Sequence, residues 1–332
     1  MIISRTPFRI SFFGGGTDYP IWYEQHGGAV ISTTIDKYCY ITVRHFPPFF
    51  RHKYRIRYSK WEDVQDIRDI EHPSVRACLQ YLNIEQGVEI IHTGDLPART
   101  GLGSSSSFTV GLLHALHALK GTVPTKQQLA LDAIHVEQNI IKENVGSQDQ
   151  ANAAHGGFSK ILFGGTHKVR VSPIEVERER LDKLQGKLML FFTGFTRTAS
   201  DIVIDQIKST PQHTRELSAM RDMVDEAYDI LTGTADRLDD FGKLLDQHWQ
   251  YKRSLTSKIS NPDIDAIYKA GMDAGAFGGK LLGAGGGGFM LFYVPLERQD
   301  EVREKLKHLV HVPFAFEKTG STIIYYTSKS HF

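Results

Sequence analysis

The chain has 332 residues, of which 41% are hydrophobic and 23% charged, and its formal net charge is +1. This length exceeds the ~100–200 residues usual for one domain, so we expect two domains with a ligand cleft between them. The near-neutral charge disfavours a nucleic-acid-binding protein, which normally carries a basic excess. No run approaches the ~20 apolar residues that cross a bilayer, and no signal-peptide pattern opens the chain, so no membrane association is expected.

Cysteine usage points to a reducing compartment. The chain has two cysteines, Cys39 and Cys78. Two cysteines can form neither a disulfide framework nor a four-cysteine metal site. A reduced, cytoplasmic protein is therefore the simplest expectation. The sequence predicts no oligomeric state.

The first half of the chain is predicted to begin with strands and continue with helices. β-branched and aromatic residues predict a strand over 2–13, two strands within 29–43 separated by a turn near Asp36-Lys37, and further strands over 54–58 and 87–93. Helical spacing predicts helices over 72–82, 108–119 and 125–142, with Ser104–Ser107 and Thr125 as their capping residues, and a turn into a helix over 146–154. A hairpin of 157–163 with 169–171 would close a first domain.

The second half is predicted to be mainly helical between two groups of strands. A charged segment, 175–186, precedes a buried-type strand over 187–193, and the pattern is helical from 200 to 274 with a break near Thr232–Thr234 and a cap at Ser260-Asn261-Pro262. A glycine turn and strand over 280–294, a helix over 297–310 and strands over 313–317 and 322–326 follow. Because strands and helices do not alternate regularly, we predict an α+β fold with domains at 1–175 and 176–332.

The segment LPARTGLGSSSS, Leu96–Ser107, is the clearest candidate for a functional loop. Its glycines permit positive φ and close approach of the backbone to a ligand. Free N–H groups at the start of the following helix would attract an anion. No Gly-Lys-Ser/Thr follows, so the segment is not a Walker A loop. By itself it is equally compatible with a serine-capped surface turn.

Two other motifs flank this loop in the chain. The stretch PFRISFFGGGTDY begins at Pro7, and KLLGAGGGGF begins at Lys280. This ordered set resembles the GHMP kinases, a family that includes galactokinase, homoserine kinase, mevalonate kinase and phosphomevalonate kinase. The resemblance extends from residue 7 to about residue 290. It implies two α+β domains, a ribosomal protein S5 domain 2-like N-terminal domain and a ferredoxin-like C-terminal domain, and an ATP-dependent kinase that uses Mg²⁺.

Within this family the sequence looks most like the bacterial heptose kinases. The stretches FFGGGTDYP, GSQDQ at Gly146–Gln150 and FTGFTR at Phe192–Arg197 carry that similarity, together with KLLGAGGGGF. The resemblance implies phosphorylation of the anomeric C1 hydroxyl of D-glycero-D-manno-heptose 7-phosphate. The product would be the 1,7-bisphosphate, used to make nucleotide-activated heptose for surface polysaccharide.

The resemblance also assigns residues to the nucleotide and the metal. Asp149 would be the catalytic base or the carboxylate that orients the acceptor, and Arg9 would hold Asp149 or stabilise the transferring phosphoryl group. Ser105 and Glu137 would bind Mg²⁺; Glu137 lies twelve residues before Asp149, as in galactokinases. The expected ATP-binding residues are Pro97, Gly101, Leu102, Gly103, Ser104, Ser105, Ser106 and Ser107. Without the family context, Glu137 would be an ordinary helix-surface carboxylate and Asp149 a helix cap.

The acceptor side is assigned in the same way. Asp18 matches an aspartate that binds sugar hydroxyls in galactokinases, although it could simply form an Asx turn. Gly15-Gly16 stand where galactokinases carry Glu-His, which argues against galactose and for a larger or differently placed sugar. A substrate phosphate needs a cationic partner, for which Arg197 and Lys280 are the candidates. The expected acceptor-binding residues are Gly15, Gly16, Thr17, Asp18, Asp149, Arg197, Lys280, Gly285 and Gly286.

Two alternatives to a heptose kinase remain open at this stage. One is a GHMP kinase for another acceptor, such as galactose or a mevalonate-type alcohol. The other is a catalytically silent protein that kept the fold and binds sugar or nucleotide as a regulator. Retention of Ser105, Glu137 and Asp149 together argues against the silent protein, because binding alone does not require all three.

Overall fold

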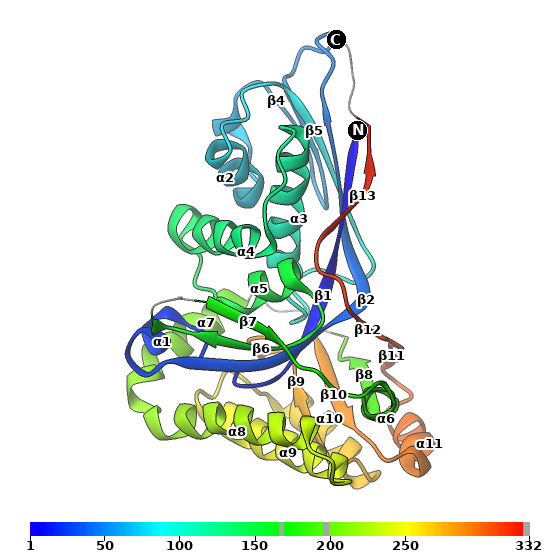
Figure 1. Cartoon of the computed structure of the whole chain (residues 1–332). Coiled ribbons are helices and arrows are strands. Elements are labelled where there is room, and N and C mark those ends of the chain that lie inside the picture. Colours follow the sequence, from blue (N-terminus) through cyan, green and yellow to red (C-terminus); the bar gives the residue numbers. More distant parts are fainter. Residues whose placement is uncertain (166–168, 195–198, 328–332) are drawn as a thin grey trace.

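The computed structural model describes residues 1–165, 169–194 and 199–327 (Figure 1). It contains two mixed units, each built from a mainly antiparallel sheet with helices packed against it, so the α+β prediction is confirmed. In Figure 1 the larger sheet runs down the upper half of the molecule, and the helices α8, α9 and α10 cross the lower half. The cavity described below lies where the two units meet.

The larger sheet has nine strands, and its principal order is β13-β1-β2-β5-β3-β4. β6 and β12 also pair with β2, and β7 pairs with β6. All pairings are antiparallel except that of β3 with β5. The strands are β1 (Ile2–Phe13), β2 (Gly28–His45), β3 (Tyr54–Arg57), β4 (Trp61–Val64), β5 (Val88–Gly94), β6 (Phe158–Phe163), β7 (Val169–Pro173), β12 (Phe316–Glu317) and β13 (Thr322–Tyr326).

The turn predicted near Asp36-Lys37 is wrong, because β2 is one continuous strand of 18 residues. Its register against β1 skips two residues at this point: Pro7 lies opposite Tyr38, but Phe8 lies opposite Ile35. Asp36 and Lys37 therefore form a bulge rather than a hairpin turn. The backbone N–H of Asp36 donates to the Ala315 carbonyl (2.9 Å), and its carboxylate accepts from the Ala315 N–H (2.8 Å), so Asp36 attaches the C-terminal segment to β2.

Helices cover one face of the larger sheet, as Figure 1 shows for α2, α3, α4 and α5. The central helix, α3, packs directly on β1 and β2. It approaches closely because Gly111 has no side chain: a Cβ there would lie 2.7 Å from Thr6 Oγ1. The helical segments of this unit are α1 (Pro20–His26), η1 (Ile67–Asp69), α2 (Pro73–Tyr81), α3 (Ser104–Leu119), α4 (Lys126–His135), the π-helical turn η2 (Val136–Ile141) and α5 (Gln148–His155).

The smaller sheet has four antiparallel strands in the order β11-β8-β10-β9. Along the chain its elements follow a strand, helices, strand, strand, helix, strand sequence, which is the ferredoxin-like pattern. The strands are β8 (Leu188–Phe192), β9 (Gly278–Leu281), β10 (Phe289–Tyr293) and β11 (Val310–His311). The helical segments are α6 (Arg178–Gly186), α7 (Ala199–Ser209), η4 (Thr210–Gln212), α8 (Thr214–Thr232), α9 (Leu238–Ser254), α10 (Pro262–Asp273), η5 (Leu296–Arg298) and α11 (Gln299–Lys305).

The two units share a core and exchange chain segments. Phe241 on α9 packs edge-on against Phe12 and Phe13 at the end of β1, with ring centroids 5.4 and 5.0 Å apart. The strands β12 and β13 lie near the end of the chain, yet both belong to the larger sheet. The segment 176–332 thus contributes to both units, and a boundary near residue 175 stays a proposal.

Two further expectations concern the cysteines and the membrane. Cys39 and Cys78 are both buried and unpaired. Within the described part of the chain, none of the helices is both long and apolar enough to span a bilayer.

Candidate active site

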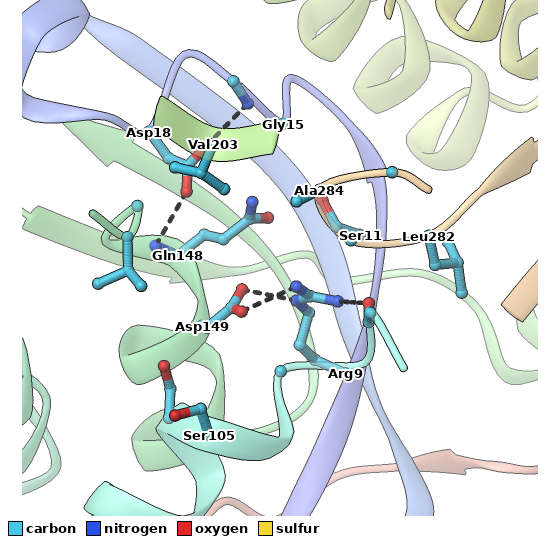
Figure 2. A pocket seen from close by; sticks show the side chains of 18 of the residues that line it. Arg9, Ser11, Gly15, Asp18, Ser105, Gln148, Asp149, Val203, Leu282 and Ala284 are labelled. Atoms are coloured by element: carbon cyan, nitrogen blue, oxygen red, sulfur yellow. Dashed lines mark hydrogen bonds and ion pairs between the residues drawn. The ribbon is translucent and has the colours of Figure 1, made fainter. Parts of the chain in front are cut away.

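A polar cavity opens where the two units meet (Figure 2). It is bounded by the end of β1, the loop that leads into α3, the start of α5, and α7 and α9 of the second unit. The loop after β9, which carries the late glycine run, closes another side through Leu282, Gly283 and Ala284. All three motifs singled out in the sequence therefore meet in one place.

The start of α3 presents free backbone N–H groups to this cavity. Gly103 precedes the helix in the left-handed region (φ 76°), and no side chain caps the helix. Ser104 Oγ instead accepts a hydrogen bond from the Arg99 backbone N–H (3.1 Å), and Ser107 Oγ donates to the Pro7 carbonyl. The predicted serine caps are thus wrong. The uncapped end is suited to an anion, because the helix dipole and the N–H groups act together.

Arg9 and Asp149 form a bidentate ion pair on the cavity wall. Arg9 Nε lies 2.7 Å from Asp149 Oδ1, and Nη2 lies 2.8 Å from Oδ2. Arg9 Nη1 donates to the Gly101 carbonyl at 2.7 Å. One guanidinium therefore joins the base candidate to the loop before α3, named the phosphate loop below after its predicted ligand. The Arg9 residue is 4% exposed. Two parallel N–H···O bonds fix the plane of the Asp149 carboxylate, as general-base or orienting chemistry requires.

Asp18 joins the glycine turn after β1 to the start of α5. Its Oδ1 accepts from the Gly16 N–H (2.9 Å), and its Oδ2 accepts from the Gln148 N–H (3.4 Å). A Cβ on Gly146 would lie only 1.9 Å from Asp18 Oδ2, which explains the glycine there. Burial raises the pKa of Asp18, and the nearby Asp149 carboxylate adds to this rise. Asp18 therefore both lines the cavity and positions the helix that carries Asp149.

Lys252 on α9 is a cavity cation that sequence reasoning missed. It is 6% exposed, and its Nζ donates to the Gly283 carbonyl. Burial lowers the pKa of Lys252 to about 8, and Arg9 contributes to the decrease. The amine is therefore largely protonated at pH 7. It contacts Gly283, which packs directly against Gly101 of the phosphate loop.

Lys280, predicted to bind a substrate phosphate, lines the same cavity but its amine is already engaged. Its Nζ donates to the Phe12 carbonyl (2.7 Å) and lies 3.4 Å from His248 Nδ1. Burial and the neighbouring Lys252 hold the pKa of Lys280 well below its usual range. His248 Nε2 accepts from the Gly14 N–H (3.0 Å), so this buried group ties β1 to α9. Both amines donate to a backbone carbonyl, but Lys280 is the more deeply buried of the two, at 1% against 6% exposed, and also contacts His248. Lys280 is thus less suited to hold a dianion than Lys252.

Glu137 is fully buried behind the phosphate loop, on the π-helical turn η2. Its Oε2 accepts from Ser106 Oγ (2.9 Å) and Gln150 Nε2 (2.5 Å), while its Oε1 makes no hydrogen bond of normal geometry among the described residues. The Thr109 hydroxyl lies beside this carboxylate and opposes the rise in its pKa, but it donates to the Ser105 carbonyl. The structure thus pairs Glu137 with Ser106, whereas Ser105 is exposed at the cavity. An unpartnered buried carboxylate oxygen beside serine hydroxyls fits Mg²⁺, which prefers oxygen ligands.

Glu137 should make stability depend on pH and on Mg²⁺. Burial raises the pKa of Glu137 from 4.5 to about 7. Between these values the unfolded chain loses its proton first, so stability falls as pH rises from 4.5 to 7. The wild type should therefore lose folding stability on the order of 3 kcal/mol over this range. Glu137→Gln should not show this loss, because glutamine does not ionise. Chemical denaturation of both proteins at pH 5 and pH 8 without Mg²⁺ measures this.

Mg²⁺ supplies the complementary measurement. The ion would bind the ionised carboxylate, so we expect it to raise the melting temperature of the wild type more at pH 8 than at pH 6. The Glu137→Gln variant should show little Mg²⁺ effect at either pH. A stability difference between the two proteins that does not change with pH would contradict the assignment of this pKa to Glu137.

Most of the predicted site residues border the cavity. These are Arg9, Gly15, Gly16, Asp18, Gly101, Gly103, Ser104, Ser105, Ser106, Asp149, Lys280 and Gly285. Glu137 does not line the cavity itself but accepts a hydrogen bond from Ser106, which does. The structure does not place Pro97, Leu102, Ser107, Thr17 or Gly286 at the cavity: Leu102 belongs to the core, and Thr17 Oγ1 bonds the Gly14 and Ala29 carbonyls. Arg197 lies outside the described residues.

The cavity is also lined by residues, many of them within the motifs, for which the sequence predicted no role. Arg99 lies in the phosphate loop itself, and Ser11 lies two residues after Arg9 on the same face of β1. Lys252 could have been found from helical spacing, because it falls in line with the buried Phe241, Leu245 and His248 on α9. The other lining residues without a predicted role are Tyr19, Asn144, Val145, Gly146, Gln148, Val203, Gln206, Leu282, Gly283, Ala284 and Gly287.

Comparison with known proteins identifies the family. The model for the GHMP kinases N terminal domain matches residues 72–157, and the model for the GHMP kinases C terminal matches residues 217–311. A D-glycero-alpha-D-manno-heptose 7-phosphate kinase of Campylobacter jejuni is 29% identical, over 96% of this chain and 97% of its own length. A galactokinase of Pyrococcus furiosus is 22% identical over 92% of each chain.

A solved structure agrees with these matches. The crystal structure titled as a D-glycero-D-manno-heptose 1-phosphate kinase from Bacteroides thetaiotaomicron superposes with a TM-score of 0.80, at 22% sequence identity, over 99% of this chain and 100% of that one. Both domain models match in the expected order, and they fall on the two units whose junction forms the cavity. The chain therefore belongs to the GHMP kinase family and is an ATP-dependent phosphotransferase.

Proposed function

We propose that this kinase phosphorylates the anomeric hydroxyl of a sugar phosphate, D-glycero-D-manno-heptose 7-phosphate, to give the 1,7-bisphosphate. The observation that carries the proposal is the Arg9–Asp149 pair, which stands opposite the uncapped start of α3 in one cavity (Figure 2). A phosphoryl donor bound at α3 and a hydroxyl bound at Asp149 would face each other. That arrangement is what direct transfer between two oxygens needs.

The residues around this cavity can be given distinct tasks. The N–H groups of Ser104, Ser105 and Ser106 would hold the ATP phosphates at the helix start. Asp149 would accept the proton of the hydroxyl or orient it, while Arg9 keeps the carboxylate in place. Lys252 and Arg99 would neutralise charge that develops on the transferring group.

Mg²⁺ would be held by Glu137 together with Ser105 or Ser106. When bound, the ion would neutralise negative charge on the phosphate oxygens of the nucleotide. Glu137 is suited to this position because it lies on the π-helical turn behind the loop, and one of its oxygens accepts no hydrogen bond from the residues that the structure describes.

Similarity to the heptose phosphate kinases supports a sugar phosphate as acceptor. The Campylobacter jejuni kinase aligns over 96% of this chain, whereas the mevalonate kinase of Methanocaldococcus jannaschii aligns over 70%. The names of the heptose kinases differ in where the acceptor already carries its phosphate, at position 7 in one and position 1 in the other. The acceptor position is therefore the first quantity to measure. A cytoplasmic role in nucleotide-activated heptose synthesis would follow from the 7-phosphate.

An acceptor panel tests the proposal. ATP consumption would be measured with heptose 7-phosphate, heptose 1-phosphate, mannose, galactose and mevalonate, and the product of any reaction located by ³¹P NMR. We expect turnover with heptose 7-phosphate and a new phosphate on the anomeric carbon. Turnover only with mevalonate, or only with a free hexose, would overturn the acceptor assignment. Tight sugar binding without any ATP consumption would favour the silent regulator.

A further inference from the structure

The middle residue of the Gly14-Gly15-Gly16 turn is a glycine that the fold does not require. Gly14 and Gly16 have φ of 79° and 110°, and a Cβ on them would lie 1.9 Å from the Ala29 carbonyl oxygen and 2.9 Å from Gln206 Nε2. Gly15 has no such constraint: its φ is not in the left-handed region. A Cβ on Gly15 would meet only Ser11 Oγ and Gln148 Nε2, each at the ordinary contact distance of 3.6 Å.

The two side chains that border this space are polar, and each has an atom without a hydrogen-bond partner in the described part of the chain. Ser11 is 6% exposed, and its Oγ has no hydrogen-bond partner among the described residues. The Oε1 atom of Gln148 is also inaccessible and unpartnered. Both residues line the cavity, and the Gln148 atom nearest Gly15 is the amide Nε2. Buried polar atoms are normally hydrogen-bonded, so two cavity-lining side chains with unpartnered atoms are suited to bind a polar group of a ligand.

Both side chains face the reacting groups. Ser11 follows Arg9 by two residues on β1 and so projects from the same face of the strand. Gln148 directly precedes Asp149 at the start of α5, and its backbone N–H is held by Asp18. Figure 2 shows Ser11, Gln148, Asp18 and Asp149 around one cavity. A group bound between Ser11 and Gln148 would therefore belong to the molecule whose hydroxyl lies at Asp149.

We propose that Ser11 and the Gln148 amide bind hydroxyl groups of the acceptor in the space left by Gly15, and thereby select a polyhydroxylated acceptor over a simple alcohol. The proposal rests on the proposed sugar kinase function. A hydroxyl and an amide can each donate and accept, which matches neighbouring sugar hydroxyls. An acceptor without those hydroxyls would leave both buried groups unpaired, and this is a strong basis for discrimination.

Three variants test the pair: Ser11→Ala, Gln148→Leu and Gly15→Ala. Steady-state kinetics would be measured with heptose 7-phosphate and with its monodeoxy analogues, at saturating ATP. We expect Ser11→Ala and Gln148→Leu to raise the KM for heptose 7-phosphate by about 3- to 10-fold each, since each loses a neutral hydrogen bond. Gly15→Ala should raise it by at least about 10-fold, because its methyl group fills the space. The KM for ATP and the melting temperature should not change.

Ser159 provides a matched control. It is a buried serine, 1% exposed, whose Oγ is also unpartnered, but it lies on β6 and does not border the cavity. Ser159→Ala should leave the KM for heptose 7-phosphate unchanged. One monodeoxy analogue should in addition be used equally well by Ser11→Ala and the wild type, because the hydroxyl that Ser11 contacts is missing from it.

The outcomes separate this inference from the proposed function. Turnover of heptose 7-phosphate by the wild type, with all three variants showing a wild-type KM, would overturn the inference and leave the kinase assignment in place. An equal rise in KM for Ser159→Ala would also overturn it, because the effect would then be structural. Wild-type turnover restricted to mevalonate would overturn both. A rise confined to the cavity variants supports the pair.

Discussion

Asp149→Asn is expected to lower kcat by a factor of about 10²–10⁴ while leaving the affinity for ATP nearly unchanged. Asparagine preserves the size of the side chain but cannot take a proton. It also presents at most one oxygen to Arg9, which now makes two bonds of 2.7 and 2.8 Å to the carboxylate. The hydroxyl would therefore lose both its proton acceptor and its alignment, whereas the phosphates contact α3 and should bind as before.

Single-turnover kinetics and ATP-analogue titration measure these two quantities separately. Asp225→Asn is a suitable control, because Asp225 also forms an ion pair, with Lys160, but is 69% exposed in its side chain and distant from the cavity wall. Its kcat should equal that of the wild type. A normal kcat for Asp149→Asn would exclude Asp149 as base and as orienting group alike.

Lys252→Met is expected to lower kcat by about 10²–10³-fold without lowering the stability of the fold. The loss of rate follows from removing a buried cation that faces the phosphate loop. Stability should be maintained because burial already lowers the pKa of Lys252 to about 8, which shows that the charged amine is disfavoured there. Replacing a buried charge with an apolar group of similar volume is often neutral or stabilising.

The pH dependence of the rate provides the second readout for this residue. In the unliganded protein Lys252 loses its proton as pH rises through about 8, so the kcat/KM of the wild type should fall there. Lys252→Arg should retain its charge and move this fall to higher pH. Lys269→Met, on a lysine that is 73% exposed in its side chain, should change nothing. A wild-type kcat for Lys252→Met would remove Lys252 from the charge-stabilising set.

Local sequence patterns determined most of the secondary structure. The strand over Ile2–Phe13 and the helix caps at Thr125 and Asn261 were found as predicted, because each depends on a few neighbouring residues. The predicted turn at Asp36-Lys37 was wrong because it too was inferred from neighbouring residues alone. Polar residues suggested a local turn, but pairing with β1 and the Ala315 contact kept the strand extended.

The sequence by itself also determined the family and indicated the candidate site residues, because the three motifs consist of residues close along the chain. Arg9, Asp18, Asp149 and the loop Gly101–Ser106 were identified in this way, and they meet at one cavity. Only the tertiary structure decided which serine contacts Glu137, that Lys280 donates to the Phe12 carbonyl, and that Lys252 lines the cavity and contacts Gly283. These facts depend on how α9 and η2 pack against distant strands. Burial and pairing between segments more than a hundred residues apart leave little trace in local sequence, and they set the charge and the free hydrogen-bonding atoms of the site.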